Sequence, residues 1–455
     1  MRVITFGCRL NHAESHVMAE AAEAAGLDHA VLVNSCAVTN EAERQLAQTL
    51  RKLRREQPAR PIILTGCAST IRPEQYRDLA DYIIPNASKT NLAHFRAVHA
   101  HLARKKDGSQ GEKASQTDPA NAPSVAAIPA AGTAFAGTAF AETAFAGTPA
   151  AGSPAGHMRA WLQVQQGCDH RCTFCAIPQG RGPSMSFAPE QILEQALHLI
   201  KRGHRDLVLT GVDLTSWQFR FGGEDWRLGR LVLYLLDRLP GFVRVRLSSL
   251  DPGEIDAELF ELIASDQRLM PSIHLSLQSG DDLILKRMKR RHLREDVIML
   301  CKRLKQRREE LVFGADFITG FPTESDAMFE HTRKMVEACG LIRLHVFPYS
   351  PRIGTPAARI PNQIAPELRR HRARLLRKDA ARNLAAYYAS QHGKIVEIML
   401  ETATSGRSLD DSPVRLGEAV RSRVGSCLRV RIDGHDDQGL LATVQANQLQ
   451  GTGMA

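Results

Sequence analysis

Three cysteines lie within eight residues in the segment "GCDHRCTFCAIP", where Cys168, Cys172 and Cys175 have the spacing C-x3-C-x2-C. A disulfide would use two of them, whereas zinc sites and iron–sulfur clusters normally take four protein ligands. Three thiolates can hold three irons of a cubane cluster and leave the fourth iron open to a small molecule that carries an amine and a carboxylate. His170 lies inside the segment, so a zinc site with three cysteines and one histidine is the alternative.

Three more cysteines each follow a short apolar run. The runs "RVITFGC", "AVLVNSC" and "PIILTGC" end at Cys8, Cys36 and Cys67. Helix-like segments at 14–25 and 41–55 separate the runs, and this alternation predicts an open parallel sheet. Ligands bind such sheets beyond the carboxyl ends of the strands, so we expect the three cysteines to converge on one shared site. Three buried core cysteines are the alternative, but a core cysteine would lie inside its strand rather than directly after it.

The composition indicates a globular protein with an acidic partner. The chain has 455 residues, a formal net charge of +10 and a sequence pI near 9.3, which favours a polyanion as the partner. Nine cysteines without paired spacing, together with an N-terminus that lacks a long apolar segment, predict a cytoplasmic protein. The Ala-rich stretch 125–147 contains Pro129 and Glu142 and no leucine, so we interpret it as a linker and expect no membrane span.

This linker divides the chain into domains. Residues 107–157 are rich in Ala, Gly, Thr, Ser and Pro and contain imperfect pentads such as "AGTAF", which predict a disordered segment between an N-terminal domain at 1–106 and a core at 158–390. Residues 391–455 contain "KIVEIMLE", "SCLRVRIDG" and "GLLATVQ", in which apolar and polar residues alternate. This last part is expected to be a small antiparallel β module that resembles a barrel.

The core alternates strand-like and helix-like segments. Apolar strand candidates occur at 161–167, 206–212, 243–249, 272–279, 312–320 and 342–350. Helical segments such as 189–201 and 295–308 separate them. The pattern predicts an α/β fold, specifically a partial or closed β/α barrel with its functional loops at the carboxyl ends of the strands. The cysteine segment follows the first of these strands, where such a loop belongs.

With Phe174 before its last cysteine, the cysteine segment resembles the signature of radical S-adenosylmethionine (SAM) enzymes. Other segments resemble one family of them, the methylthiotransferases, in the same order along the chain. "FGCRLNHAES", "NSCAVTN" and "TGCAST" are similar to its N-terminal domain, and "HLSLQSGDDLILKRMKR", "DFITGFPTES" and "HVFPYSPRIGTPAA" to its radical core. The last module stands where that family carries its RNA-binding TRAM domain. The resemblance covers nearly the whole chain except the linker.

The resemblance implies two 4Fe-4S clusters with one open iron each. Cys168, Cys172 and Cys175 would hold the catalytic cluster, on which SAM is cleaved by one electron to a radical that takes hydrogen from an aromatic carbon. A cluster on the three N-terminal cysteines would supply sulfur, and a second SAM the methyl group. The electron would come from a flavodoxin-like or equivalent donor. The residues that the resemblance places near SAM are Phe174, Gly211, Ser249, Gln278 and Gly320. The remaining cysteines are expected to be structural.

The segment "GCRLN" bears on the substrate. It resembles the "GCKVN" type of the threonylcarbamoyladenosine enzymes more than the "GCQMN" type of the isopentenyladenosine enzymes, with Arg9 and Leu10 in place of Lys and Val. The resemblance therefore implies conversion of N6-threonylcarbamoyladenosine, beside the anticodon of tRNA, to its 2-methylthio derivative. Isopentenyladenosine in tRNA and an aspartate of a ribosomal protein are the alternatives. Phe187 stands where the family usually has an arginine.

Two basic runs, at 286–294 and 369–382, favour contacts with tRNA phosphates. The residues that we expect to bind RNA are Arg290, Arg291, Arg369, Arg370 and Arg374. A solvated helix face is the ordinary explanation for either run alone. A target base in an exposed loop could be turned out of its stack into the barrel mouth. A zinc-stabilised RNA-binding protein without catalysis is the alternative from another class, and it would contain zinc and no iron.

Overall fold

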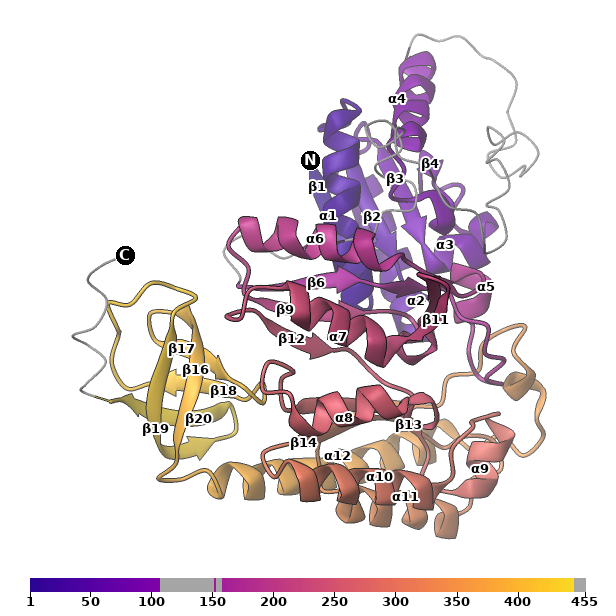
Figure 1. The fold of residues 1–455 in the computed structure, drawn as a ribbon. Helices are drawn as coiled ribbons and strands as arrows, with labels where there is room; N and C mark the ends of the chain where they lie inside the picture. Colours follow the sequence, from indigo (N-terminus) through magenta and orange to yellow (C-terminus); the bar gives the residue numbers. More distant parts are fainter. Residues whose placement is uncertain (107–150, 153–157, 446–455) are drawn as a thin grey trace.

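The computed structural model describes residues 1–106, 151–152 and 158–445. An N-terminal α/β domain, a central α/β core and a small β-barrel follow one another along the chain (Figure 1). Most of the predicted disordered linker at 107–157 lies outside the described residues. Within the described part of the chain, no helix is both long and apolar enough to cross a membrane.

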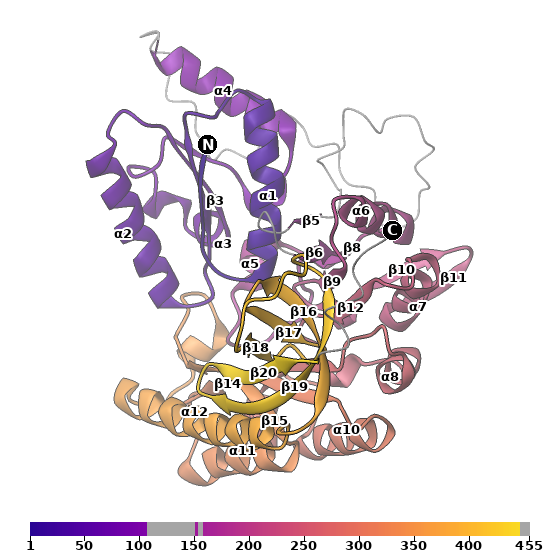
Figure 2. The same ribbon diagram turned by 90° about the vertical axis from the view of Figure 1, so that its left-hand side faces the viewer.

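The N-terminal domain contains a four-stranded parallel sheet in the order β1-β2-β3-β4. Its strands are β1 (Arg2–Thr5), β2 (Val31–Ser35), β3 (Ile62–Gly66) and β4 (Tyr82–Ile83), and its helices are α1 (Arg9–Ala24), α2 (Asn40–Glu56), α3 (Cys67–Ile71) and α4 (Leu92–Lys106). All residues of β2 and β3 are buried, as in a sheet covered on both faces. Helix α2 packs on one face and helices α1 and α4 on the other (Figure 2). The predicted open parallel sheet is confirmed.

The central core contains the six predicted strands, which form an open barrel. They are β6 (Arg159–Gln163), β9 (Asp206–Thr210), β12 (Arg244–Leu247), β13 (Ser272–Gln278), β14 (Val312–Thr319) and β15 (Leu341–Pro348). The strands β12, β9 and β6 form one parallel sheet and β13, β14 and β15 another. Single parallel bridges, Val245 to Leu269 and Leu250 to Leu275, join the two sheets. Among the described residues, no pairing connects β15 back to β6, so the barrel is partial.

The edge of β6 is covered by part of the predicted linker. Ala151–Gly152 form β5, which pairs antiparallel with Trp161 and Leu162 of β6. These two residues depart from the predicted disorder because the edge strand of a sheet offers unpaired backbone groups to a neighbouring segment.

Helices cover the outer face of the core. They are α6 (Pro189–Lys201), α7 (Leu228–Arg238), α8 (Ala257–Ser265), α9 (Asp282–Arg287), α10 (Arg294–Arg307), α11 (Asp326–Ala338) and α12 (Pro366–Ala389). A hairpin that the sequence pattern did not predict consists of β10 (Gln218–Phe221) and β11 (Glu224–Arg227). Along β13, Ile273, Leu275 and Leu277 are buried against the helices, while His274 and Gln278 are half-buried. The period of two therefore turns the polar side chains toward the barrel interior.

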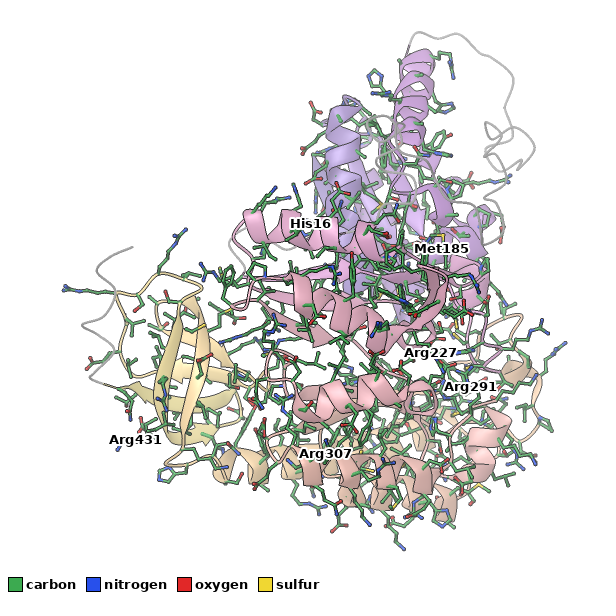
Figure 3. All side chains as sticks on the ribbon, in the orientation of Figure 1. His16, Met185, Arg227, Arg291, Arg307 and Arg431 are labelled. Carbon is green, nitrogen blue, oxygen red and sulfur yellow. The ribbon has the colours of Figure 1, made fainter. Side chains whose placement is uncertain are left out.

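The C-terminal module is a closed barrel in the order β16-β17-β18-β20-β19. Its strands are β16 (Ile395–Thr402), β17 (Ser405–Ser408), β18 (Pro413–Leu416), β19 (Cys427–Asp436) and β20 (Gly439–Val444). Leu428, Val430 and Ile432 of β19 fill its interior, while Arg429 and Arg431 are exposed. Arg431 lies on the outer side of this barrel (Figure 3). The predicted β module is confirmed, although the sequence pattern did not single out the short strands β17 and β18.

The small barrel docks on the amino ends of the core strands. Arg159, the first residue of β6, pairs with Asp411 at 2.8 Å and with Asp206 at 3.1 Å. Arg246 of β12 donates to the carbonyl oxygen of Leu409 at 2.9 Å. Since the predicted functional loops lie at the carboxyl ends of these strands, the small barrel and those loops occupy opposite ends of the core (Figure 1).

The basic run on α12 is divided between a buried and an exposed helix face. Arg369 is only 8% exposed, and its guanidinium donates to the carbonyl oxygens of Ile364 at 2.7 Å and Tyr349 at 2.9 Å. The prediction that Arg369 binds RNA is therefore wrong, because its donors already satisfy buried carbonyl groups. Arg370 and Arg374 lie on the exposed face.

Substitution of Arg369 by alanine is expected to destabilise the core. Loss of two buried hydrogen bonds costs roughly 2 to 3 kcal/mol, which corresponds to a fall in melting temperature of roughly 5 to 10 °C. The matched control is Arg370→Ala, which removes an exposed ion pair with Glu367 and should lower the melting temperature by about 2 °C or less. Equal melting temperatures for the two variants would contradict the structural role of Arg369.

Candidate functional site

The cysteine loop follows β6 and the short strand β7 (Gln165–Gln166), and is closed by α5 (Ile177–Arg181) and β8 (Met185–Ser186). Gly167 has a φ of +69°, and a Cβ there would lie 1.7 Å from the carbonyl oxygen of Pro183, so only glycine fits at the entry. Cys168, Cys172 and Cys175 are half-buried and lie close enough to interact electrostatically. The structure therefore brings these thiols together in one loop.

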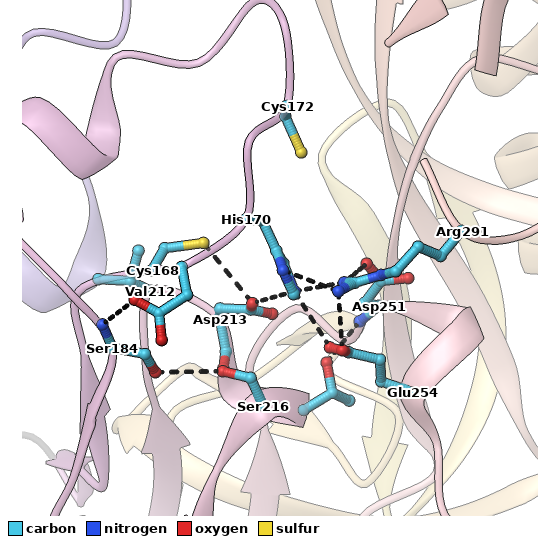
Figure 4. Close-up of polar contacts among 12 residues, drawn as sticks. Cys168, His170, Cys172, Ser184, Val212, Asp213, Ser216, Asp251, Glu254 and Arg291 are labelled. Carbon is cyan, nitrogen blue, oxygen red and sulfur yellow. Dashed lines mark hydrogen bonds and ion pairs between the residues drawn. The ribbon is translucent and has the colours of Figure 1, made fainter. Parts of the chain in front are cut away.

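One carboxylate contacts the first cysteine of this loop, and others lie around the neighbouring His170. The Cys168 thiol donates to Oδ2 of Asp213 at 3.6 Å, and His170 Nε2 lies 2.6 Å from the same oxygen (Figure 4). Arg291 extends toward His170, Asp251 and Glu254 in the same view. Burial and the charge of Asp213 raise the pKa of the Cys168 thiol to about 12. His170 is thus engaged by acidic side chains.

The three N-terminal cysteines also converge. Cys8 is the N-cap residue of α1, Cys36 follows β2, and Cys67 opens α3 directly after β3. Cys36 interacts electrostatically with both others, and burial raises the pKa of its thiol to about 11. Gly7, with a φ of +97°, would place a Cβ 2.7 Å from Cys36 Sγ, so the absence of a side chain permits this approach. The structure therefore places these cysteines at the carboxyl edge of the N-terminal sheet.

The two sets of cysteines face each other across the domain junction. Cys175 of the core lies close enough to Cys67 to interact electrostatically. A Cβ on Gly180 of α5 would lie 3.1 Å from Cys67 Cβ. Asn86 Nδ2 donates to the carbonyl oxygen of Gly180 at 2.6 Å and lies 3.7 Å from Cys67 Sγ. Helices α3 and α5 are consequently neighbours (Figure 1).

The residues expected near SAM have different surroundings. Phe174 is half-buried and packs against a small apolar cluster that contains Phe321 and Tyr349. Gly211, Ser249 and Gln278 are half-buried at the carboxyl ends of β9, β12 and β13.

Gly320 lies at the end of β14, and a Cβ there would lie 2.5 Å from Arg369 Cγ, so this glycine makes room for α12. Phe187, at the position where an arginine is usual, is buried in the apolar core.

In the basic run at 286–294, Arg290 points to the site, whereas Lys286, Lys289 and Arg291 are exposed. Arg290 has a side chain that is 7% exposed, and it pairs with Asp251 at 3.0 Å and lies 3.8 Å from Cys172 Sγ. The prediction that Arg290 binds RNA is therefore wrong, because a buried carboxylate already holds its guanidinium. Arg291 is 41% exposed and is held by Asp251 and Glu254.

Gln165 is a positioning residue that sequence reasoning missed. It is fully buried, and its Oε1 accepts from the backbone N–H groups of Val212 and Asp213 at 2.9 Å each. Its Nε2 donates to the carbonyl oxygen of Gly167 and to Ser184 Oγ, also at 2.9 Å. One side chain therefore ties the cysteine loop to the loop after β9. The only sequence signal was a glutamine two residues before Gly167.

A polar cluster faces the barrel interior on β13, β14 and β15. His274 Nε2 and His345 Nδ1 each lie 3.0 Å from Oδ1 of Asp316. Burial alone would raise the pKa of Asp316, but the hydrogen bonds to these histidines lower it to about 2. The cluster presents hydrogen-bonding groups inside the barrel, and sequence reasoning did not single it out.

Comparison with known proteins identifies the two domains. The Radical SAM superfamily matches residues 162–336, and Uncharacterized protein family UPF0004 matches residues 1–84. The threonylcarbamoyladenosine tRNA methylthiotransferase MtaB of Rickettsia prowazekii (strain Madrid E) is 38% identical over 437 residues, which cover 96% of this chain and 95% of that protein. The chain belongs to the radical SAM methylthiotransferase family.

Other relatives of this methylthiotransferase are more distant. MtaB of Thermotoga maritima is 29% identical over 466 residues, covering 99% of this chain and 98% of the relative. The tRNA-2-methylthio-N(6)-dimethylallyladenosine synthase of Ehrlichia chaffeensis is 29% identical and covers 81% of this chain and 80% of the relative. The radical SAM methyltransferase TsrM of Kitasatospora setae, solved with cobalamin and a 4Fe-4S cluster, has a TM-score of 0.50 at 13% identity, covering 77% of this chain and 70% of its own. This last likeness concerns the fold.

The cofactors of this methylthiotransferase are 4Fe-4S clusters and SAM, and the spacing of the cysteines fits such clusters. Among the described residues, in neither set of three cysteines do all the sulfur atoms lie within 4.8 Å of one another. Two thiolates on one zinc ion lie at most about 4.6 Å apart, twice the Zn–S distance. In each set at least one pair of thiols therefore lies farther apart than one zinc ion allows, whereas the thiolates of a cluster bind different irons. Cys168, His170 and Asp213 do place their donor atoms within 4.8 Å of one another, but neither Cys172 nor Cys175 joins this group, so one zinc ion on all three cysteines and His170 does not fit.

Substitution of Gln165 by leucine is expected to loosen the cysteine loop. The variant leaves buried N–H and carbonyl groups unpaired, which costs roughly 2 to 4 kcal/mol and lowers the melting temperature by roughly 5 to 12 °C. The control is Gln166→Leu, the neighbouring half-buried residue, whose side chain makes one long contact with Gln163. An equal effect of both substitutions on the melting temperature would show that Gln165 does not hold the loop.

Proposed function

We propose that this protein is a tRNA methylthiotransferase that converts N6-threonylcarbamoyladenosine, beside the anticodon, to its 2-methylthio derivative. The observation that carries the proposal is the pair of three-cysteine sets that face each other across the domain junction. Addition of both sulfur and a methyl group to one substrate needs two cofactor sites that reach the same part of it. Two adjacent cysteine sets meet this requirement. The 38% identity to MtaB of Rickettsia prowazekii supports the choice of substrate.

In this proposal the six cysteines hold the two clusters. Cys168, Cys172 and Cys175 hold the cluster that binds SAM, and Cys8, Cys36 and Cys67 hold the other. When bound, these groups supply a radical that can take hydrogen from an aromatic carbon, the sulfur, and the methyl group. A flavodoxin-like or equivalent protein provides the electron. The protein acts in the cytoplasm, where its thiols stay reduced and tRNA is present.

The side chains around Cys168 are suited to bind SAM, which carries a positive sulfonium and a positive amine. Asp213 places a carboxylate beside the first cysteine, and Glu254 lies 3.4 Å from His170 Nε2. His170 and Arg291 hold these carboxylates in place. Phe174, together with the strand-end residues Gly211, Ser249, Gln278 and Gly320, completes the part of the site that we assign to SAM.

The polar interior of the barrel is suited to the nucleoside. Asp316 accepts hydrogen bonds from His274 and His345, and all three belong to the strands that line the interior. A base turned out of the anticodon loop needs such donors and acceptors for its edge and for its N6 substituent. On the protein surface, the exposed Arg370 and Arg374 of α12 supply positive charge for tRNA phosphates.

Metal analysis tests the assignment of the clusters. Anaerobically prepared protein is expected to contain about eight irons per chain, and Cys172→Ala about four, because one of two 4Fe-4S clusters is lost. The control is Cys427→Ala, which replaces an exposed cysteine outside both sets and should leave about eight irons. Zinc in place of iron would contradict the assignment, and so would a Cys172→Ala protein without any iron.

The substrate is tested by profiling modified nucleosides in tRNA from a deletion strain. The strain is expected to lack the 2-methylthio derivative of N6-threonylcarbamoyladenosine and to regain it from a plasmid with the intact gene. A plasmid that encodes Cys8→Ala should not restore the derivative, whereas Cys427→Ala should. Loss of the 2-methylthio derivative of isopentenyladenosine instead would assign that nucleoside as the substrate.

A further inference from the structure

A buried cluster of charges connects the two domains beside the cysteines. It consists of Glu14 on α1, Lys89 after the short helix Asn86–Ser88, and Arg181 at the end of α5. The side chains of Glu14, Lys89 and Arg181 are 3%, 2% and 5% exposed. Lys89 Nζ lies 2.6 Å from Glu14 Oε2, and Arg181 binds both carboxylate oxygens of Glu14 at 2.9 Å. The cluster therefore contains two cations and one carboxylate.

Arg181 is also connected to the loops that carry Cys8 and Cys36. Its Nη2 donates to Asn11 Oδ1 at 2.6 Å. Asn11 Nδ2 in turn donates to the carbonyl oxygen of Phe6 at 2.7 Å and to that of Ser35 at 3.1 Å. Phe6 and Ser35 come directly before Gly7–Cys8 and Cys36 in the chain. One guanidinium of the core thus fixes two N-terminal loops through a single asparagine.

The residues on either side of Arg181 contact the remaining cysteines. Gly180 lies against Cys67, as described above, and a Cβ there would be 3.1 Å from Cys67 Cβ, closer than ordinary van der Waals contact. The carbonyl oxygen of Gly182 accepts a hydrogen bond from the backbone N–H of Cys168 at 3.2 Å. The segment Gly180–Arg181–Gly182 therefore touches the third N-terminal loop and the first cysteine of the core.

Among the described residues, the charge cluster carries an excess of positive charge. Two buried cations and one carboxylate leave a positive excess, and an uncompensated buried charge is strongly destabilising. Arg181 lies close enough to Cys67 and Cys8 to interact with them electrostatically, and Lys89 close enough to Cys67. A 4Fe-4S core held by three thiolates has a net charge of about −1, and the local charge affects its reduction potential. The charge of the cluster and that of the protein around it are thus complementary.

We propose that Arg181 is a positioning residue that fixes the loops of Cys8 and Cys36 against the radical core and stabilises the negative charge of the cluster that the N-terminal cysteines hold. This inference rests on the proposed function, because it requires a cluster on Cys8, Cys36 and Cys67. It follows that Arg181 raises the reduction potential of that cluster and that Glu14, which neutralises part of the positive charge, lowers it.

The test is a redox titration of the full-length Cys172→Ala protein, which retains only the N-terminal cluster. Electron paramagnetic resonance monitors the reduced cluster at each potential. In this background, Arg181→Met is expected to shift the midpoint potential to a more negative value, because reduction adds negative charge that the guanidinium no longer stabilises. Glu14→Gln keeps the shape of the side chain and is expected to shift the midpoint to a more positive value. Shifts of opposite sign would support the electrostatic role, since a purely structural disturbance has no reason to produce them.

Two further variants separate charge from position. Arg181→Lys keeps the positive charge, so the midpoint should stay close to that of the Cys172→Ala protein. A lysine cannot bridge Glu14 and Asn11 together, so amide hydrogen exchange in residues 6–8 and 34–36 should become faster. The matched control is Arg202→Met. Arg202 also pairs with α1, through Glu20 at 3.6 Å, but this pair is exposed, and its loss should leave the midpoint unchanged.

The outcomes distinguish failure of this inference from failure of the proposed function. A Cys172→Ala protein without iron would contradict the cluster on the N-terminal cysteines, and therefore the proposed function. Iron at about four per chain, with an unchanged midpoint in Glu14→Gln, would overturn the inference while the cluster assignment stands. Shifts in the same direction for Glu14→Gln and Arg181→Met would overturn it as well.

Discussion

The close contact between α5 and the N-terminal cysteine loops is the constraint on which both cysteine sets depend. Gly180 allows the backbone of α5 to reach Cys67, and Arg181 binds Glu14 and Asn11. The same short helix follows the C-x3-C-x2-C segment by two residues, so its position also determines where Cys175 lies. A shift of α5 would therefore move the two sets relative to each other. Such a shift would separate groups that have to act on one nucleoside.

The arrangement of the sheets explains why the two sets meet. Both the N-terminal sheet and the partial barrel are parallel, so the loops after their strands gather at one edge of each. The domain junction brings these two edges together. The small barrel is held at the amino ends of the core strands by Arg159 and Arg246. The catalytic cysteine loop and the small barrel consequently lie at opposite ends of the core (Figure 1).

The arginines show how charge in this protein serves more than one purpose. Arg290 and Arg369 belong to basic runs that resemble phosphate-binding surfaces, yet both are buried and paired within the core. Arg370 and Arg374 remain exposed on the other face of α12. A run of basic residues on a helix is distributed over all of its faces because each residue turns by about 100°. Burial of each residue, and not the length of the run, therefore decides which arginines can meet RNA.

The sequence by itself determined the alternation of strands and helices in both α/β domains, the interior and exterior faces of β19, and the convergence of Cys8, Cys36 and Cys67 after successive strands. These features depend on local patterns, namely apolar runs, period-two alternation and the spacing of thiols. It did not determine the hairpin of β10 and β11, the roles of Gln165 and Asp316, or the pairing of Arg181 with Glu14, which lie 167 residues apart. Only the tertiary structure decided these, because contacts between residues distant in the chain depend on how whole sheets and helices pack. The sequence around Arg181 does not predict that its partner is Glu14.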